Sequence, residues 1–230
     1  MNDFLQNTLF FGVLISLICY FLGLFLKKKF KLDIFNPLLI SILFVIGFLL
    51  LFRVDLETYD NSAKYLSYLL TPATVCLAIP LYEELETLKK NFLAIIISIT
   101  SGVVTSLTSI LIMSKLFDLS HIEYVTLLPK SITTAIGIGI SEELGGIVNI
   151  SVAVIIVTGI LGNMIAPMVF KIFKIEDPIA RGLALGTSAH AIGTAKALEY
   201  GTLEGAMSGL SIAVAGILTV ILANFYALIM

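Results

Sequence analysis

The sequence of 230 residues is 58% hydrophobic and 13% charged, with a mean hydropathy of +1.05. A soluble domain is roughly 45–50% apolar, so this composition predicts an integral membrane protein. The net charge of -2, without a basic patch interleaved with aromatic residues, excludes a nucleic-acid partner. We expect one all-α transmembrane domain over residues 1–230, built from segments of about 20 apolar residues that cross a ~30 Å hydrocarbon core.

Apolar segments of this length follow one another along the chain, and about seven to eight are expected to cross the bilayer. The first is preceded by Asp3 and followed by a run of lysines, and it is longer than the apolar core of a signal peptide, so we interpret it as a retained span. In chain order the segments cover residues 4–26, 36–52, 62–81, 91–113, 121–140, 145–170, 178–200 and 203–229.

The charges between these segments predict their direction. Lysines at 27–31, 89–90 and 171–174 mark cytoplasmic loops by the positive-inside rule, whereas the loop 53–61 is acidic and is expected outside. An even number of crossings must separate the second and third lysine loops, yet three segments lie between them. We therefore expect the fifth segment, residues 121–140, to enter and leave from the outer side as a re-entrant hairpin. The seventh segment is then expected to cross outward once, and the eighth to return.

Interrupted helices are expected at matching places in two halves of the chain. Proline interrupts the third segment at Pro72 and again at Pro80, and the fifth at Pro129, because it removes a helical hydrogen bond. We predict two repeats, residues 1–115 and 116–230, which are inverted if the fifth segment is re-entrant. Such a repeat with broken helices indicates a secondary transporter whose site lies near the midplane. The weak self-match at an offset of 116 pairs Thr71 with Thr187, Ala73 with Ala189 and Glu83 with Glu199.

Ionisable and hydroxylated side chains within the apolar segments indicate a binding site. An ionisable group at membrane depth costs about 2.5–3.5 kcal/mol on insertion scales, so it tends to face a cavity, a partner or a substrate path. Free N–H groups at a helix interruption attract an anion, and the donors present suit a small hydroxy or keto acid. The predicted substrate-binding residues are Lys130, Ser131, Thr133 and Thr134 at one interruption, and Thr187, Ser188, His190, Gly193, Thr194 and Lys196 in the seventh segment.

His190 and Glu199 are the residues expected to carry a coupling proton, His190 because imidazole titrates near cytoplasmic pH. Each polar residue also has a simpler interpretation. His190 can tie one helix to another by a hydrogen bond, and Lys196 and Glu199 can lie at a helix end and reach the membrane interface. Lys130, inside an apolar stretch, is harder to explain without a ligand.

At these residues the sequence resembles the LrgB/CidB family of membrane proteins, some of which are described as antiholin-like. The resemblance is closest in the second half of the chain, and in the first half it rests mainly on hydropathy and size. The family pattern has proline after the Thr-Thr pair, where this chain has Ala135, so the kink there is expected to be softer. The matching stretches are LLPKSITTAIGIGISEELGGI, TGILGN and ARGLALGTSAHAIGTAKALEYGTLEGAMSGLS.

The resemblance implies one of two functions. One is a holin/antiholin-like modulation of murein hydrolase activity and cell lysis, together with a small LrgA/CidA-type membrane partner. The other is transport, because related proteins resemble carriers of pyruvate in bacteria and of glycolate and glycerate in plastids. The plastid relatives resemble a fusion of the partner with a chain of this type, which is consistent with a hetero-oligomeric transporter.

The residues favour the carrier, because a pore of simple spans needs no broken helices, buried histidine or hydroxyl clusters. We expect a transporter of small monocarboxylates in the bacterial plasma membrane, with an LrgA/CidA-type partner and homo-oligomerisation as a further expectation. An enzyme is not expected, since the sequence lacks an HExxH pair and a complete GxSxG elbow. No metal or cofactor is expected, because Cys19 and Cys76 lack metal-ligand spacing.

Overall fold

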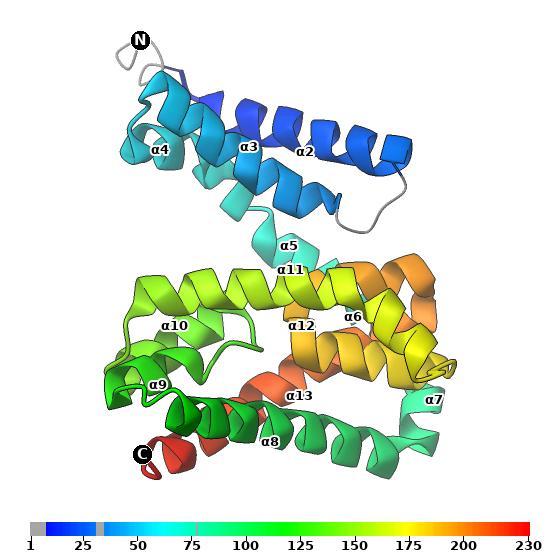
Figure 1. Cartoon of the computed structure of the whole chain (residues 1–230). Coiled ribbons are helices and arrows are strands. Elements are labelled where there is room, and N and C mark those ends of the chain that lie inside the picture. The colour runs from blue at the N-terminus through cyan, green and yellow to red at the C-terminus, as the bar shows by residue number, and fades with distance from the viewer. Residues whose placement is uncertain (1–7, 31–34, 77) are drawn as a thin grey trace. The chain divides into compact units, whose positions relative to one another are not determined.

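The computed structural model describes residues 8–30, 35–76 and 78–230, and every regular element within them is a helix. The predicted all-α class is confirmed. The chain divides into two compact units, Met1–Cys76 and Leu77–Met230. The count of seven to eight crossings, the single transmembrane domain and the repeat of the two halves stay predictions. In the described part, four helices are long and apolar enough to cross a membrane: α2 (Phe11–Phe30), α8 (Phe92–Leu116), α11 (Val148–Ile172) and α13 (Thr202–Ala227) (Figure 1).

The first unit is a bundle of short and long helices. The backbone N–H of Gly12 donates to the hydroxyl of Ser62 over 2.8 Å, which holds α2 against α4. A Cβ added to Gly23 would lie 2.7 Å from the carbonyl oxygen of Pro37, so this glycine lets α2 and α3 approach closely. Besides α2, the unit contains α3 (Pro37–Phe52), α4 (Leu56–Ser67) and α5 (Leu70–Cys76).

The acidic loop predicted at residues 53–61 is wrong in part, because α4 begins at Leu56. Asp55 occupies its N-cap position and Glu57 its first turn, where negative charge favours a helix start. The predicted interruption near Pro72 is present, because α4 ends at Ser67 and α5 begins at Leu70. Pro72 lies in the first turn of α5, where a helix does not need the missing N–H. The side chain of Thr71, used in the predicted repeat, lies outside the described residues.

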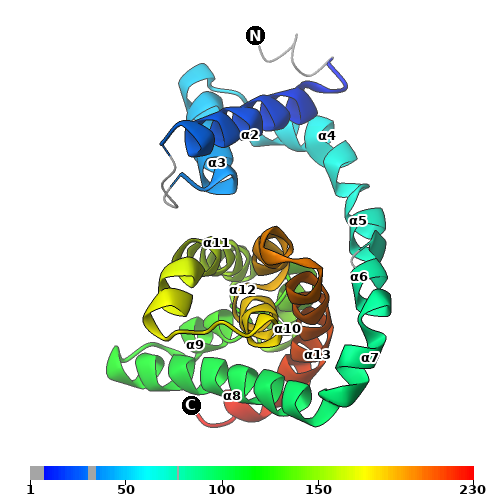
Figure 2. The same ribbon diagram turned by 90° about the vertical axis from the view of Figure 1, so that its right-hand side faces the viewer.

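The second unit contains the remaining long helices and several interrupted ones. In Figures 1 and 2, α12 lies between α11 and α8, and α13 packs along it. Within the described residues the unit consists of α6 (Ala78–Glu83), α7 (Leu85–Lys90), α8, α9 (His121–Leu127), α10 (Thr134–Glu143), α11, α12 (Pro178–Tyr200) and α13.

The helices α9 and α10 form a hairpin, hairpin 1, interrupted near Pro129 as the sequence predicted. The hydroxyl of Ser151, early in α11, donates to the carbonyl oxygen of Thr126 over 2.7 Å and lies 2.8 Å from the hydroxyl of Ser141. Nearer the turn, a Cβ added to Gly137 would lie 3.6 Å from the Cβ of Pro129. The chain therefore turns back near Pro129, and Thr126 of α9 and Ser141 of α10 both lie against the start of α11.

The helix α12 turns back on itself at His190, whose φ of 42° and ψ of -135° are not helical. The guanidinium carbon of Arg181 lies 5.7 Å from the centre of the Tyr200 ring, whereas a straight helix would separate these residues by roughly 28 Å. A Cβ added to Gly193 would overlap the carbonyl oxygen of Leu185. The single outward crossing predicted for this segment is therefore wrong, and α12 forms a second hairpin, hairpin 2.

The helix α13 runs parallel to the first half of hairpin 2. Glycines make this packing close: a Cβ added to Gly182 would lie 2.5 Å from the carbonyl oxygen of Glu204, and one added to Gly186 would meet Ser208. Both contacts pair residues 22 positions apart, so the two helices run in the same direction. The helix α13 therefore starts at the base of hairpin 2 and extends past its tip.

The tips of the two hairpins meet halfway along α8. A Cβ added to Gly102 would lie 2.6 Å from the Cγ2 of Thr187 in hairpin 2. One turn further along α8, the hydroxyl of Ser106 lies 3.0 Å from that of Ser131 in hairpin 1. Hairpin 1 connects the end of α8 to the start of α11, so α8 and α11 run in opposite directions. Hairpin 2 follows the end of α11, and its base therefore lies at the other end of that helix. The two hairpins thus enter the unit from opposite ends.

Candidate functional site

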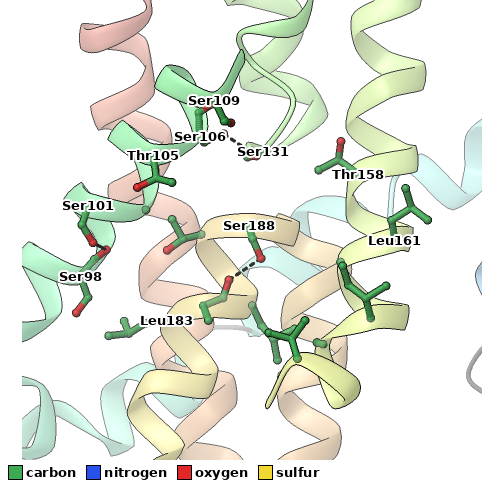
Figure 3. A pocket seen from close by; sticks show the side chains of 18 of the residues that line it. Ser98, Ser101, Thr105, Ser106, Ser109, Ser131, Thr158, Leu161, Leu183 and Ser188 are labelled. Carbon is green, nitrogen blue, oxygen red and sulfur yellow. Dashed lines mark hydrogen bonds between the residues drawn. The ribbon is translucent and has the colours of Figure 1, made fainter. Parts of the chain in front are cut away.

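A cavity of about 760 Å³ lies beside the two hairpin tips, within the second unit. Its wall comes from α8, the tip of hairpin 1, α11 and the first half of hairpin 2. Among the described residues that line it, one is a cation and none carries a carboxylate. The polar lining consists of Lys130, Ser98, Ser101, Thr105, Ser106, Ser109, Ser131, Thr158, Thr187 and Ser188. Figure 3 shows part of this lining, including the side chains of Thr105, Thr158 and Ser188.

Lys130 is the charged group of the cavity. Its Nζ donates to the hydroxyl of Ser131 over 2.9 Å and to that of Ser106 over 3.2 Å. No carboxylate of the described residues lies within ion-pair distance of this ammonium group. Hydroxyl groups satisfy the hydrogen-bonding capacity of a buried ammonium but do not balance its charge, and a buried charge is normally paired. The site is therefore electrostatically suited to an anion.

One face of α8 supplies most of the hydroxyl groups. Ser98, Ser101, Thr105 and Ser109 follow at intervals of three or four residues, which places them on one side of the helix. Figure 3 shows them in succession, with Ser131 opposite Ser106. None of these α8 residues was among the predicted substrate-binding residues, because serine and threonine inside an apolar helix commonly serve helix packing. Their spacing is the signal that could have revealed this wall.

Four of the ten predicted substrate-binding residues line the cavity: Lys130, Ser131, Thr187 and Ser188. Thr187 is 8% exposed and sits at the hairpin tip against Gly102. The Ser188 hydroxyl donates to the carbonyl oxygen of Ala184 over 2.6 Å and faces the cavity. The remaining predicted residues lie off the cavity wall: Thr133, Thr134, His190, Gly193, Thr194 and Lys196.

His190 connects the tip of hairpin 2 to α11. Its Nε2–H donates to the carbonyl oxygen of Ile155 over 3.0 Å, and the side chain is only 4% exposed. A Cβ added to Gly159 would lie 2.7 Å from this Nε2, so a glycine on α11 makes room for the ring. The geometry matches the simpler interpretation of this histidine, a tie between helices, and a coupling role stays a prediction.

The other off-cavity residues are paired locally. The hydroxyl of Thr194 lies 2.8 Å from that of Ser208 on α13. Lys196 and Glu199 form an ion pair of 2.7 Å, and the Lys196 ammonium lies 5.5 Å from the centre of the Tyr200 ring. Thr133 takes the N-cap position of α10, without a capping hydrogen bond from its side chain. These contacts stabilise the hairpins and leave the cavity to Lys130 and the hydroxyl groups around it.

The comparisons with known proteins agree on one family. The sequence model of the LrgB-like family matches residues 16–229. The chain belongs to the LrgB-like family. An antiholin-like protein LrgB of Bacillus subtilis (strain 168) is 35% identical over 213 residues, which cover 92% of this chain and 92% of the relative. The comparison with solved structures found no match to this LrgB-like chain.

Proposed function

We propose that the chain is a secondary transporter-like membrane protein that moves small monocarboxylates through the cavity beside its two hairpin tips. The observation that carries this proposal is the cavity lining: one ammonium group, nine hydroxyl groups and no carboxylate among the described residues. A single carboxylate would balance the single charge of Lys130, while the hydroxyl groups could bind a keto or hydroxy oxygen. The volume of about 760 Å³ lies within the usual range for small-ligand sites.

The arrangement of helices supports the same proposal. Broken helices that meet near the middle of a membrane protein are a feature of secondary transporters. Non-helical backbone at that depth is tolerated where it lines protein or water, as at the two hairpin tips. We propose action by binding and release, without chemical change of the substrate. The proposed location is the bacterial plasma membrane, and the proposed partner is a small LrgA/CidA-type membrane protein.

A second candidate function rests on the name of the Bacillus subtilis relative, antiholin-like protein LrgB. A chain with that function would modulate murein hydrolase activity and cell lysis. This alternative requires no discrimination between small anions, so substrate preference separates the two proposals.

Ligand-dependent stability tests the proposed site directly. A ligand that binds only the folded chain raises its melting temperature according to its concentration and affinity. We expect pyruvate and glycolate to stabilise the purified protein, and the neutral amide glycolamide to have little effect at the same concentration. The dianion malonate should stabilise it less than pyruvate, because it leaves one charge unbalanced. Equal stabilisation by glycolamide would contradict an anion site.

A further inference from the structure

Two consecutive stretches of the second unit are built in the same way. The helices α8 and α11 each contain 25 residues and begin 56 residues apart, at Phe92 and Val148. Each ends in a turn with a left-handed residue, Asp118 with a φ of 54° and Lys174 with a φ of 52°, again 56 residues apart. Each turn leads into a hairpin. The repeated unit is therefore a long helix, a capped turn and a returning helix pair.

The amino-acid sequence carries the same repeat. The tripeptide Ala-Ile-Gly occurs at residues 135–137 and again at 191–193, 56 positions later, in the returning half of each hairpin. Gly145 and Gly201, which follow the two hairpins, keep the same separation. Because α8 and α11 run in opposite directions and the hairpins enter from opposite ends, the two repeats are inverted.

The cavity breaks the symmetry between these repeats. It is lined by Ala166 and Phe170 of α11, in the half of that helix that leads to the base of hairpin 2. The equivalent positions of α8, Ile110 and Ser114, do not line the cavity, although all four residues are buried. The hydroxyl of Ser114 is buried without a hydrogen-bond partner among the described residues. Buried hydroxyl groups seldom lack a hydrogen-bond partner. A conformation in which the Ser114 hydroxyl has a partner would explain why a serine stands at this position.

Tyr124 of hairpin 1 occupies the repeat position of a cavity-lining residue of hairpin 2. It is 0% exposed, and its counterpart 56 residues later is Ala180, which lines the open cavity. The Tyr124 hydroxyl donates to the carbonyl oxygen of Tyr226 at the end of α13 over 2.9 Å. A bulky, anchored side chain in one repeat thus replaces a small cavity-lining one in the other.

We propose that a second access route to the anion site runs along Ile110 and Ser114 of α8 and is closed by Tyr124 in this structure. The inference rests on the proposed function. The route opens when hairpin 1 moves away from α13 and hairpin 2 closes against α8 and α11, so that the inverted repeats exchange conformations. An anion bound at the hairpin tips then becomes accessible from the other end of the unit, while the long helices α8 and α11 stay in place.

Cysteine accessibility tests the route independently of transport. In a chain without its native cysteines, Cys19→Ala and Cys76→Ala, single cysteines are introduced as Ser114→Cys and Phe170→Cys, and a membrane-impermeant maleimide is added to either side of vesicles. We expect Phe170→Cys to react from the side of the lysine loops and Ser114→Cys to react slowly from the opposite side. Ile110→Cys, with Ala166→Cys as its counterpart, repeats the comparison if Ser114→Cys fails to fold.

The variant Tyr124→Phe sharpens the test, because it removes the hydrogen bond that holds hairpin 1 and keeps the ring. Labelling of Ser114→Cys should become about two- to tenfold faster, the ratio that corresponds to the loss of one net hydrogen bond. The control is Tyr226→Phe, which removes the 2.6 Å contact of Tyr226 with Thr108 and leaves the carbonyl acceptor of Tyr124 in place.

The outcomes separate the route from the proposed function. Labelling of Ser114→Cys from the opposite side, accelerated by Tyr124→Phe and not by Tyr226→Phe, establishes the route. Absence of labelling at both Ser114→Cys and Ile110→Cys while monocarboxylate uptake proceeds overturns the route and leaves the carrier. Opposite-side labelling without any substrate uptake keeps the route and overturns the carrier.

Discussion

Lys130 is the residue on which the proposed anion site depends most. Its ammonium group is held by Ser106 and Ser131, so the charge has a fixed place between α8 and hairpin 1. Pro129 and the polar residues that follow Lys130 identified this lysine in the sequence. An ionisable side chain in an apolar segment is costly, so it usually has a function. Ser106 could not be identified in the same way, since a serine inside a transmembrane helix commonly serves helix packing.

Replacing Lys130 with methionine should remove the anion interaction while keeping a side chain of similar length. A hydrogen bond to a charged group contributes about 1.5–3 kcal/mol, so the concentration for half-maximal uptake should rise by roughly 10- to 150-fold. Lys130→Arg keeps the charge and should retain part of the activity. Uptake kinetics and melting temperature are measured for both variants. A Lys130→Met protein that folds and transports normally would rule out this lysine as the anion ligand.

His190 is expected to act by positioning hairpin 2, because its ring contacts the backbone of α11 and does not line the cavity. Its φ of 42° with a ψ of -135° is a conformation that glycine adopts more easily. His190→Gly should therefore be more stable than His190→Ala, by roughly 1 kcal/mol. The measurements are the melting temperature and uptake at two pH values. If His190→Gly is stable but has lost all proton-dependent uptake, the histidine carries the coupling proton instead.

At the scale of elements, the sequence predicted the first hairpin better than the second. Pro129 marks an interruption because its ring cannot continue a helix without a kink, and the charge rule required an even number of crossings near it. The turn in α12 has no such marker. His190 is an unusual residue for a left-handed turn, and the residues on both sides of it favour helix, so periodicity alone indicates one continuous span. Gly193 is the residue that could have signalled the turn.

Gly193→Ala should disrupt hairpin 2, because the added methyl group would overlap the carbonyl oxygen of Leu185 in the opposite half. Backbone atoms cannot move aside as side chains do, so we expect a loss of at least about 2 kcal/mol of stability. The matched control is Gly139→Ala in the returning half of hairpin 1. Nothing lies within 4 Å of an added Cβ there, and its repeat counterpart is already Ala195.

The control variant Gly139→Ala should be neutral or more stable by about 0.5–1 kcal/mol, since alanine favours helix over glycine. Melting temperature and the yield of monodisperse protein distinguish the two variants. Equal behaviour of Gly193→Ala and Gly139→Ala would show that the halves of α12 are not packed as described.

For the whole molecule, composition was sufficient to predict an all-helical membrane protein, because a soluble domain of this length would carry far more polar and charged residues. The arrangement of the second unit was not predictable from composition or hydropathy. Its 56-residue repeat rests on short sequence matches such as Ala-Ile-Gly and on the geometry of two turns, and the turn geometry is visible only in the structure. The cavity likewise combines residues from four separate parts of the chain, so no local motif describes it.

The most direct measurement of the central claim is uptake of labelled pyruvate and glycolate into proteoliposomes that also contain a trapped dye. The purified chain is reconstituted alone and together with an LrgA-type partner. A carrier predicts saturable uptake that other small monocarboxylates compete for, with the dye retained. Dye leakage without preference among substrates would contradict the carrier and support the holin-like alternative.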